Sequence, residues 1–226
     1  MVINPHELQQ IQAAVQAPAV VQPQNPMKPK FEPQPKVEIL KVEKPQVTYF
    51  GKDKIPADYR EITILGTGVI PQEQALRYVQ ANARNPRLNC SVTELVNAYY
   101  EEASLEGVRP DVALCQALLE TGMFTFTGTV HPDQNNFCGL GTTGKGVKGA
   151  RFATAREGVR AHIQHLLAYC RKEEPRSKVV DPRYSLVHQI RMGKGLITKW
   201  FGLNGTWAMG ANYCEKVMAI YMDMLG

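Results

Sequence analysis

The sequence lacks long apolar runs and any recognisable secretion signal. No stretch reaches about 18 consecutive apolar residues, the length that indicates a membrane-spanning helix. The first residues also lack the basic start and apolar core of a signal peptide. We therefore expect no membrane partner, and no signal peptide is visible in this chain.

The spacing of a metal or redox site is also missing. The five cysteines form no pair with zinc-ligand or redox spacing, and their odd number favours free thiols. Cys115, Cys170 and Cys214 fall among apolar residues of expected helices, which is typical of buried small side chains. His162 and His165 have no carboxylate beside them on that helix face, so we expect a surface or structural position. The sequence predicts no metal and no cofactor.

Proline is scarce after residue 60 and abundant before it. The first 60 residues hold nine of the fifteen prolines, with Gln, Val and Lys between them. Because proline removes backbone donors and blocks helices, we expect an extended or disordered linker at 1–60. One domain is expected at 61–226. The linker leaves room for attachment to a partner protein or a larger assembly.

The charge of the chain is only modestly positive. A formal net charge of +5 suits anionic partners such as cell-wall polymers or nucleic acid, and ordinary surface charge explains it equally well. Lysines of the first 60 residues are interleaved with Glu and Asp, a mixture typical of a solvated tether. We expect no nucleic-acid ligand.

Helical periodicity with start and stop signals marks six segments after residue 60. Capping boxes begin two of them, at Ser91 to Glu94 and at Thr154 to Glu157. Residues 122–149 hold seven glycines, which excludes a regular helix and predicts short β-strands and tight turns. The sequence therefore predicts an α+β domain that is mostly α, with helices at 71–84, 91–105, 110–121, 154–170, 184–192 and 208–225.

Glu120 stands in an otherwise apolar run. Pro110 begins this segment and Gly122 ends it, and a helix that is apolar on nearly every face is a buried one. A carboxyl in apolar surroundings has a raised pKa, which suits a general acid that works near neutral pH. The alternative is a partly exposed glutamate that meets solvent at a helix end. The glycine-rich segment that follows favours a cleft wall suited to a carbohydrate.

Short motifs follow one another over residues 68–226. They are 119–122 (LETG), 135–140 (NNFCGL), 152–159 (FATAREGV), 165–169 (HLLAY), 181–184 (DPRY), 203–208 (LNGTWA) and 212–217 (NYCEKV). Together they resemble the motifs of the glucosaminidase family of peptidoglycan hydrolases. The resemblance implies a lysozyme-like helical domain with a small glycine-rich β-lobe. It also implies that the protein binds peptidoglycan glycan strands and cleaves N-acetylglucosaminyl bonds, as an endo-beta-N-acetylglucosaminidase does.

Glycosidic cleavage needs an acid for the leaving oxygen and a group that stabilises the sugar cation. Glu120 is the candidate acid. Asp133 is the candidate second carboxylate, since no other acidic residue lies between Glu120 and Glu157, although its surroundings are ordinary turn composition. The resemblance places a site-facing tyrosine at Tyr213, which could orient a water or the substrate's own acetamido group. A core tyrosine at helical spacing is the alternative.

Six further residues are candidates for binding the sugar. Amides suit hydroxyl and acetamido groups, and aromatic rings suit sugar faces. Each type also has a structural explanation, because Asn tolerates turn conformations and aromatic residues are commonly buried. The candidates are Asn135, Asn136, Phe137, Gly139, Tyr184 and Trp207.

Two other functions fit the same residues. A muramidase or lytic transglycosylase of the same fold would use a similar helix-end glutamate on a different bond. A wall-binding or assembly module would keep the fold without turnover. The expected location is extracellular, at the cell wall, or in a phage particle. With no visible signal peptide, an autolysin would need another export route, whereas a phage lysin released by a holin would need none.

Overall fold

The computed structural model describes residues 58–142, 149–210 and 212–226, which all belong to one compact unit, Gln46–Gly226. The linker predicted at 1–60 therefore lies almost entirely outside the described residues. Its last residues enter the 3-10 helix η2 (Tyr59–Glu61), where Tyr59 packs on Phe201 with 5.5 Å between the ring centroids. The packed part of the chain thus includes the last residues of the segment predicted as linker.

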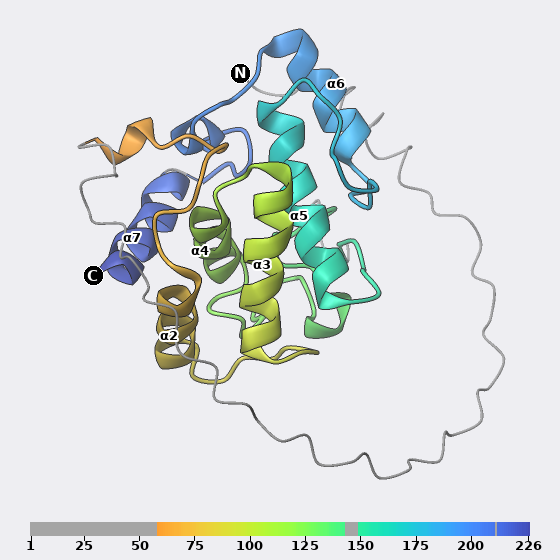
Figure 1. Ribbon diagram of the computed structural model, residues 1–226. Helices are drawn as coiled ribbons and strands as arrows, with labels where there is room; N and C mark the ends of the chain where they lie inside the picture. Colours follow the sequence, from red (N-terminus) through yellow and green to blue (C-terminus); the bar gives the residue numbers. More distant parts are fainter. Residues whose placement is uncertain (1–57, 143–148, 211) are drawn as a thin grey trace, which may run out of the picture. The chain divides into compact units, whose positions relative to one another are not determined.

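The described residues are mostly helical, as the sequence predicts (Figure 1). The largest difference is the start of the last helix, which lies at Tyr213 and not at residue 208. Residues 203–208 form a turn instead, in which the N–H of Trp207 donates to the carbonyl of Leu203 at 2.9 Å. The helices are α2 (Gln72–Asn82), α3 (Val92–Glu106), α4 (Pro110–Glu120), η3 (Pro132–Gln134), α5 (Ala155–Cys170), α6 (Tyr184–Lys194), η4 (Trp200–Leu203) and α7 (Tyr213–Leu225).

Side-chain caps begin α3 and α5. Ser91 Oγ accepts the N–H of Glu94 at 3.1 Å while Glu94 Oε2 accepts the N–H of Ser91 at 2.8 Å, which confirms the first capping box. Only one of the two hydrogen bonds of the second predicted capping box is present. Thr154 Oγ1 accepts the N–H of Glu157, but the Glu157 carboxylate reaches one residue further back, to the N–H of Ala153.

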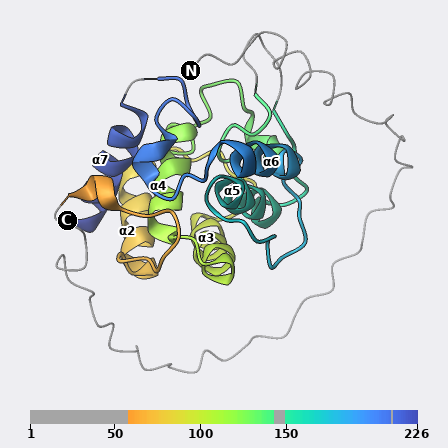
Figure 2. The same cartoon turned by 90° about the horizontal axis from the view of Figure 1, so that it is seen from above.

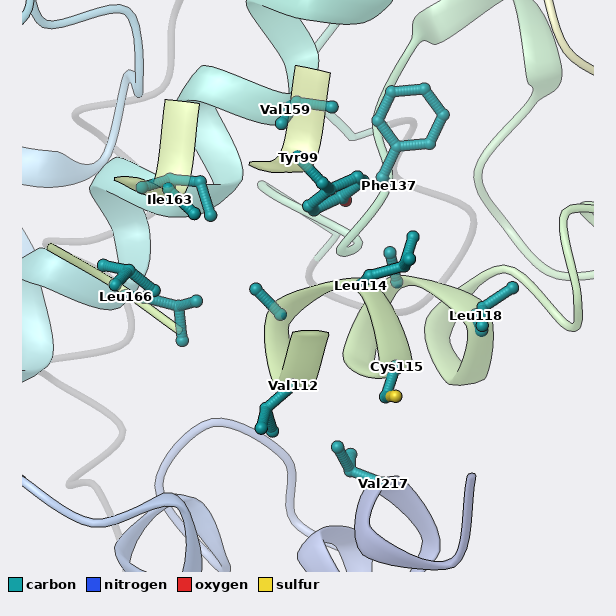
Figure 3. Packing of buried hydrophobic residues seen from close by; sticks show 14 of the residues in the cluster. Tyr99, Val112, Leu114, Cys115, Leu118, Phe137, Val159, Ile163, Leu166 and Val217 are labelled. Atoms are coloured by element: carbon teal, nitrogen blue, oxygen red, sulfur yellow. The ribbon is translucent and has the colours of Figure 1, made fainter. Parts of the chain in front are cut away.

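The apolar run of α4 is buried, as its composition predicts. Every residue from Pro110 to Leu118 is inaccessible to solvent, with α3 and α7 packed against the helix (Figures 1 and 2). Figure 3 shows Leu114 and Leu118 of α4 in the core that Val159 of α5 and Val217 of α7 also enter. Burying each such side chain contributes on the order of 2 kcal/mol, so α4 is held rigidly and its last residue has a defined position.

The glycine-rich lobe between α4 and α5 differs from the prediction, because its described residues form turns and η3 but no β-strand. Two backbone bonds link its described parts, from the N–H of Ala150 to the carbonyl of Leu140 at 2.7 Å and from the N–H of Phe152 to the carbonyl of Gln134 at 2.9 Å, and amide side chains bond further backbone groups. Asn136 Nδ2 donates to the carbonyl of Leu140 at 2.9 Å, and Asn136 Oδ1 accepts the N–H of Leu140 at 2.9 Å. Gln134 Nε2 donates to the carbonyl of Gly149 at 2.8 Å. Side-chain amides thus supplement a few backbone bonds here.

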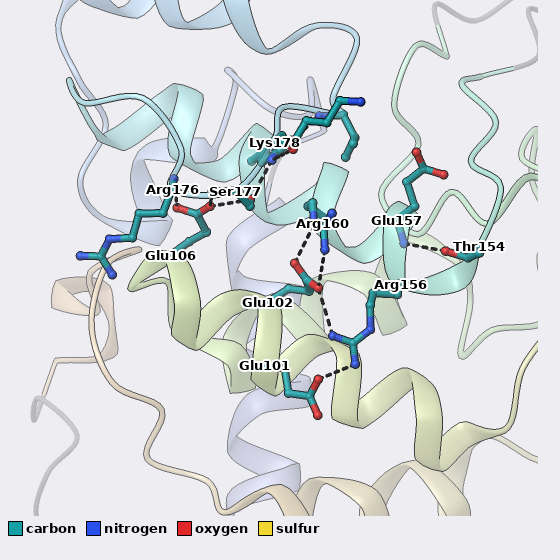
Figure 4. A network of polar contacts seen from close by, with 12 residues as sticks. Glu101, Glu102, Glu106, Thr154, Arg156, Glu157, Arg160, Arg176, Ser177 and Lys178 are labelled. Carbon is teal, nitrogen blue, oxygen red and sulfur yellow. Dashed lines mark hydrogen bonds and ion pairs between the residues drawn. The ribbon is translucent and has the colours of Figure 1, made fainter.

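A network of charged residues joins α3 to α5 and to the segment that follows α5 (Figure 4). Buried Glu102 on α3 accepts hydrogen bonds from Arg160 at 2.8 Å and from Arg156 at 3.1 Å. Glu106, one turn further on, accepts the N–H groups of Arg176 and Ser177, both at 2.9 Å. These bonds help to position α5, which also carries His162 and His165.

Candidate active site

Glu120 occupies the last position of α4, where the helix leaves the core and meets a cavity. The cavity has a volume of about 320 Å³, and Glu120 is its only carboxyl group among the described residues. The residue is exposed to the cavity, while the surrounding protein removes part of the hydration of its carboxyl. This desolvation raises the pKa of Glu120, and the hydrogen bonds that it accepts lower the pKa by less. The position at a helix C-terminus also disfavours a negative charge.

Both protein hydrogen bonds to Glu120 end on the same oxygen. Tyr213 Oη donates to Glu120 Oε1 at 2.5 Å, and Trp207 Nε1 donates to the same Oε1 at 3.1 Å. No described residue donates to Oε2, which lies 3.8 Å from the point that a Cβ on Gly139 would occupy. One oxygen is therefore held by the protein, and the other is left on the side of a cavity wall.

The predicted residue Gly139 belongs to that wall. Its φ of 69° is in the left-handed region, and a side chain there would be strained as well as close to Thr142 and Glu120. Residues 138–142 form this side of the cavity. Glycine at this position thus keeps the space beside Oε2 open.

Trp207 forms part of the other wall and rests on two aromatic side chains of α5. Its ring centroid lies 4.9 Å from that of His165 and 5.5 Å from that of Tyr169. His165 is itself held by buried Asp181, with 2.8 Å between Nδ1 and Oδ2. This packing fixes the indole that donates to Glu120.

Other predicted sugar-binding residues lie inside the protein. Asn135 and Asn136 are buried, and their amides bond the backbone of the lobe. Phe137 packs edge-on against Phe124 in the core, with 6.2 Å between the ring centroids. Tyr184 is buried and stacks on His188. None of these four lines the cavity at Glu120, so the structure agrees with the structural explanation of each.

Asp133 is not brought together with Glu120. It lines a different, open cavity of about 820 Å³ that does not include Glu120. Its carboxylate accepts a hydrogen bond from Arg151 at 2.7 Å and lies 3.3 Å from His131 Nδ1. The bond from Arg151 lowers the pKa of Asp133. The geometry gives no support to Asp133 as a base in the Glu120 cavity.

The two histidines are structural and are not surface residues. His162 is fully buried, and His165 is buried against Trp207. Cys115, Cys170 and Cys214 are buried, as predicted, and are free thiols. In the described part of the chain, no group of three His, Cys, Asp or Glu side chains could hold a metal, and no helix is long and apolar enough to cross a membrane.

Several residues at the site were not predicted as site residues from the sequence. Gln116 lies one turn before Glu120 and donates to Tyr213 Oη at 2.8 Å, and its i−4 spacing was the available signal. His165 and Arg183 line the cavity and fall within two of the quoted motifs. Cys138 also lines the cavity, and burial raises the pKa of its thiol. For Cys138, no local pattern separates a cavity position from a core position.

A glutamic acid held through one oxygen beside an open polar cavity is an arrangement suited to a glycoside hydrolase. The chain belongs to the glucosaminidase family, described as mannosyl-glycoprotein endo-beta-N-acetylglucosaminidase, which it matches over residues 96–225. The resemblance noted in the sequence is thereby confirmed. Membership of this family supports a peptidoglycan hydrolase function and a glycoside hydrolase class.

A relative from Borreliella burgdorferi is similar over much of the chain. This uncharacterized protein is 39% identical over 142 residues, which make up 62% of the present chain and 67% of the relative. No solved structure matches the chain significantly.

Proposed function

We propose that this protein hydrolyses N-acetylglucosaminyl bonds of peptidoglycan glycan strands, with Glu120 as the general acid. The observation that carries the proposal is the asymmetry of the Glu120 carboxyl. Tyr213 and Trp207 occupy Oε1, while Oε2 remains beside the cavity wall at Gly139. A proton on Oε2 can therefore be given to a glycosidic oxygen in the cavity.

The acid must hold its proton until the substrate is bound. Desolvation raises the pKa of Glu120 toward the working range of a general acid. Protonation of the leaving oxygen breaks its bond to the anomeric carbon while positive charge builds on the sugar ring.

We favour the substrate's own 2-acetamido oxygen as the nucleophile that attacks the anomeric carbon, where the positive charge builds. Glu120 is the only carboxyl group among the described residues that line the cavity, and Asp133 lines another one. Attack by the acetamido group needs no second carboxylate and leads to a product of retained configuration. Asp133 acting through water is the alternative, and it would give an inverted product. In the favoured route the Tyr213 hydroxyl keeps Glu120 in place.

Analysis of the reaction products tests the bond specificity. We expect digestion of purified peptidoglycan to create new N-acetylglucosamine reducing ends, detected by borohydride reduction and mass spectrometry. New muramic acid reducing ends would indicate a muramidase, and anhydromuramic ends would indicate a lytic transglycosylase. Wall binding with no new ends would indicate a non-catalytic module. The cell wall is the proposed place of action, since this substrate lies there. The protein could be carried to the wall in a phage particle.

A further inference from the structure

A continuous chain of hydrogen bonds runs from the protein core to Glu120. Tyr99 Oη lies 2.9 Å from His162 Nδ1, and His162 Nε2 lies 2.9 Å from Gln116 Oε1. Gln116 Nε2 donates to Tyr213 Oη at 2.8 Å, and Tyr213 Oη donates to Glu120 Oε1 at 2.5 Å. The five side chains come from α3, α5, α4 and α7, so this chain of hydrogen bonds connects four helices around the site.

All members of the chain except Glu120 are buried, which restricts how their protons can be arranged. Tyr99, His162 and Gln116 have no solvent exposure, and Tyr213 has little. Burial lowers the pKa of His162 to about 3, with a smaller contribution from the charge of His165. His162 is therefore neutral, with one ring nitrogen that donates and one that accepts.

Tyr99, the buried end of the hydrogen-bond chain, determines which member of each pair donates its proton. Among the described residues, the Tyr99 hydroxyl has His162 as its only hydrogen-bond partner. It can satisfy its own proton only by donating to Nδ1, since an unpaired buried donor is costly. His162 must then donate from Nε2 to the Gln116 oxygen, and the Gln116 amide presents its N–H to Tyr213. In the reverse direction the Tyr99 proton would have no acceptor.

The direction of donation decides where the proton lies at Glu120, the other end of the hydrogen-bond chain. Because Tyr213 accepts from Gln116, its hydroxyl proton points to Glu120 Oε1. If Gln116 presented its oxygen instead, Tyr213 would donate to Gln116 and could accept a proton held on Oε1. The acidic proton would then lie on Oε1, the oxygen that the protein holds, and not on Oε2 beside Gly139.

We infer that Tyr99, His162 and Gln116 are positioning residues whose hydrogen-bond direction keeps the acidic proton of Glu120 on Oε2. No proton travels along the chain; the Oε2 proton passes to the leaving oxygen, and the bond from that oxygen to the sugar breaks. The inference rests on the proposed role of Glu120 as the acid. It adds three buried residues to those on which the rate depends.

Replacement of His162 tests the inference most directly. In His162→Met no donor holds the Gln116 oxygen, so the amide can flip and present that oxygen to Tyr213. We expect kcat on soluble peptidoglycan fragments to fall by about tenfold, a part of the hundredfold or more that general acid catalysis contributes, with KM little changed. His162→Gln is close to Met in size and restores a donor, and we expect it to recover most of the rate.

The pH profile separates positioning from general loss of structure. The bond from Tyr213 lowers the pKa of Glu120, so its loss should move the alkaline limb of kcat to higher pH in His162→Met. Other titratable groups that line the cavity are Cys138 on the lobe, His165 and Tyr169 on α5 and Arg183 before α6, and the substitution changes none of them. An alkaline limb that does not move, or equal rates for the Met and Gln variants, would overturn the inference.

A milder pair of variants covers the case in which His162→Met fails to fold. Tyr99→Phe removes one buried oxygen at the closed end, and Tyr221→Phe removes another from α7 that has no partner among the described residues. We expect a severalfold lower kcat, and an alkaline limb moved to higher pH, in Tyr99→Phe but not in Tyr221→Phe. Identical profiles for both variants would contradict the inference. Failure of the Glu120 assignment would be recognised separately, by an active Glu120→Gln enzyme.

Discussion

At the scale of single residues, the two oxygens of Glu120 have different surroundings. Oε1 receives the bonds from Tyr213 and Trp207, and Oε2 lies beside Gly139. A carboxylic acid needs one oxygen as acceptor and one as donor, so this division matches the protonated form. The Tyr213 hydroxyl and the Trp207 indole thus fix the Glu120 carboxyl without occupying Oε2, the oxygen that we propose reacts.

Glu120→Gln should abolish the chemistry and leave the fold. Glutamine keeps an oxygen that can accept from Tyr213 and Trp207, but it has no acidic proton. We expect wall lysis to fall by on the order of a hundredfold or more, the usual loss for a general acid. Zymography and a thermal melt measure the two effects, and lysis at a tenth of the wild-type level would contradict the assignment.

Asp133 and Tyr213 give different expectations for the second half of the reaction. Asp133→Asn should change the rate by no more than about twofold, because it alters an exposed ion pair in another cavity. Tyr213→Phe should lower kcat by about tenfold or more, because Glu120 loses a donor. NMR of the first-formed anomer should show retention. An inverted product together with an inactive Asp133→Asn enzyme would reverse the preference for the acetamido route.

At the scale of elements, carboxylates of α3 hold the helices on which the site is built. Burial raises the pKa of Glu106, but bonds from Ser177, Arg176 and Arg171 outweigh it and lower the pKa overall. The contribution of a carboxylate with a lowered pKa is present above its unfolded pKa, roughly 4.3 for Glu, and is lost as the pH falls through the folded value. The contact between α3 and the segment that follows α5 should therefore weaken in acid.

Glu106→Gln should lower the stability at neutral pH and make the stability depend less on pH in the acid range. We expect a loss of about 2 kcal/mol at pH 7, since hydrogen bonds to a buried charge are broken. The difference from wild type should shrink below about pH 4, where the wild-type carboxylate is itself protonated. Thermal unfolding across pH measures this, with Glu73→Gln in an exposed pair as the control. A difference that stays constant down to pH 2 would contradict the role of the charge.

At the scale of the whole chain, composition and packing suggest slightly different boundaries for the domain. Proline content predicts a boundary near residue 60. Packing begins earlier, since η2 (Tyr59–Glu61) contacts Phe201 and Glu61 pairs with Lys199 at 2.5 Å. Ile62 and Ile64 follow directly and are buried. We therefore propose a catalytic domain that starts at about residue 58.

Deletion of residues 1–57 should leave a cooperatively folding, active domain. All nine prolines of the first 60 residues lie in this segment, which argues against packed helices there. Deletion of residues 1–65 should lower the melting temperature markedly, because it also removes Ile62 and Ile64, each worth on the order of 2 kcal/mol. Calorimetry and turnover of soluble wall fragments measure both. Loss of the thermal transition in the shorter deletion would show that residues before 58 contribute to the domain.

The local sequence determined most of the helix positions and singled out Glu120 as the candidate acid. Apolar periodicity and the caps at Ser91 and Thr154 act within one or two helical turns, so they can be read without knowing the fold. The motifs around Glu120 and Tyr213 likewise identified the family. These signals carry no information on which distant side chains meet.

Only the tertiary structure decided which residues accompany the acid. Tyr213 is 93 positions from Glu120, and their hydrogen bond depends on the packing of α7 against α4. Asp133 is close to Glu120 in sequence but belongs to another cavity, because Arg151 and His131 hold it there. The described residues of the lobe form turns and no strand, and the amides of Gln134 and Asn136 bond backbone groups of residues up to 16 positions away. Such choices depend on contacts among several elements at once, which no local pattern encodes.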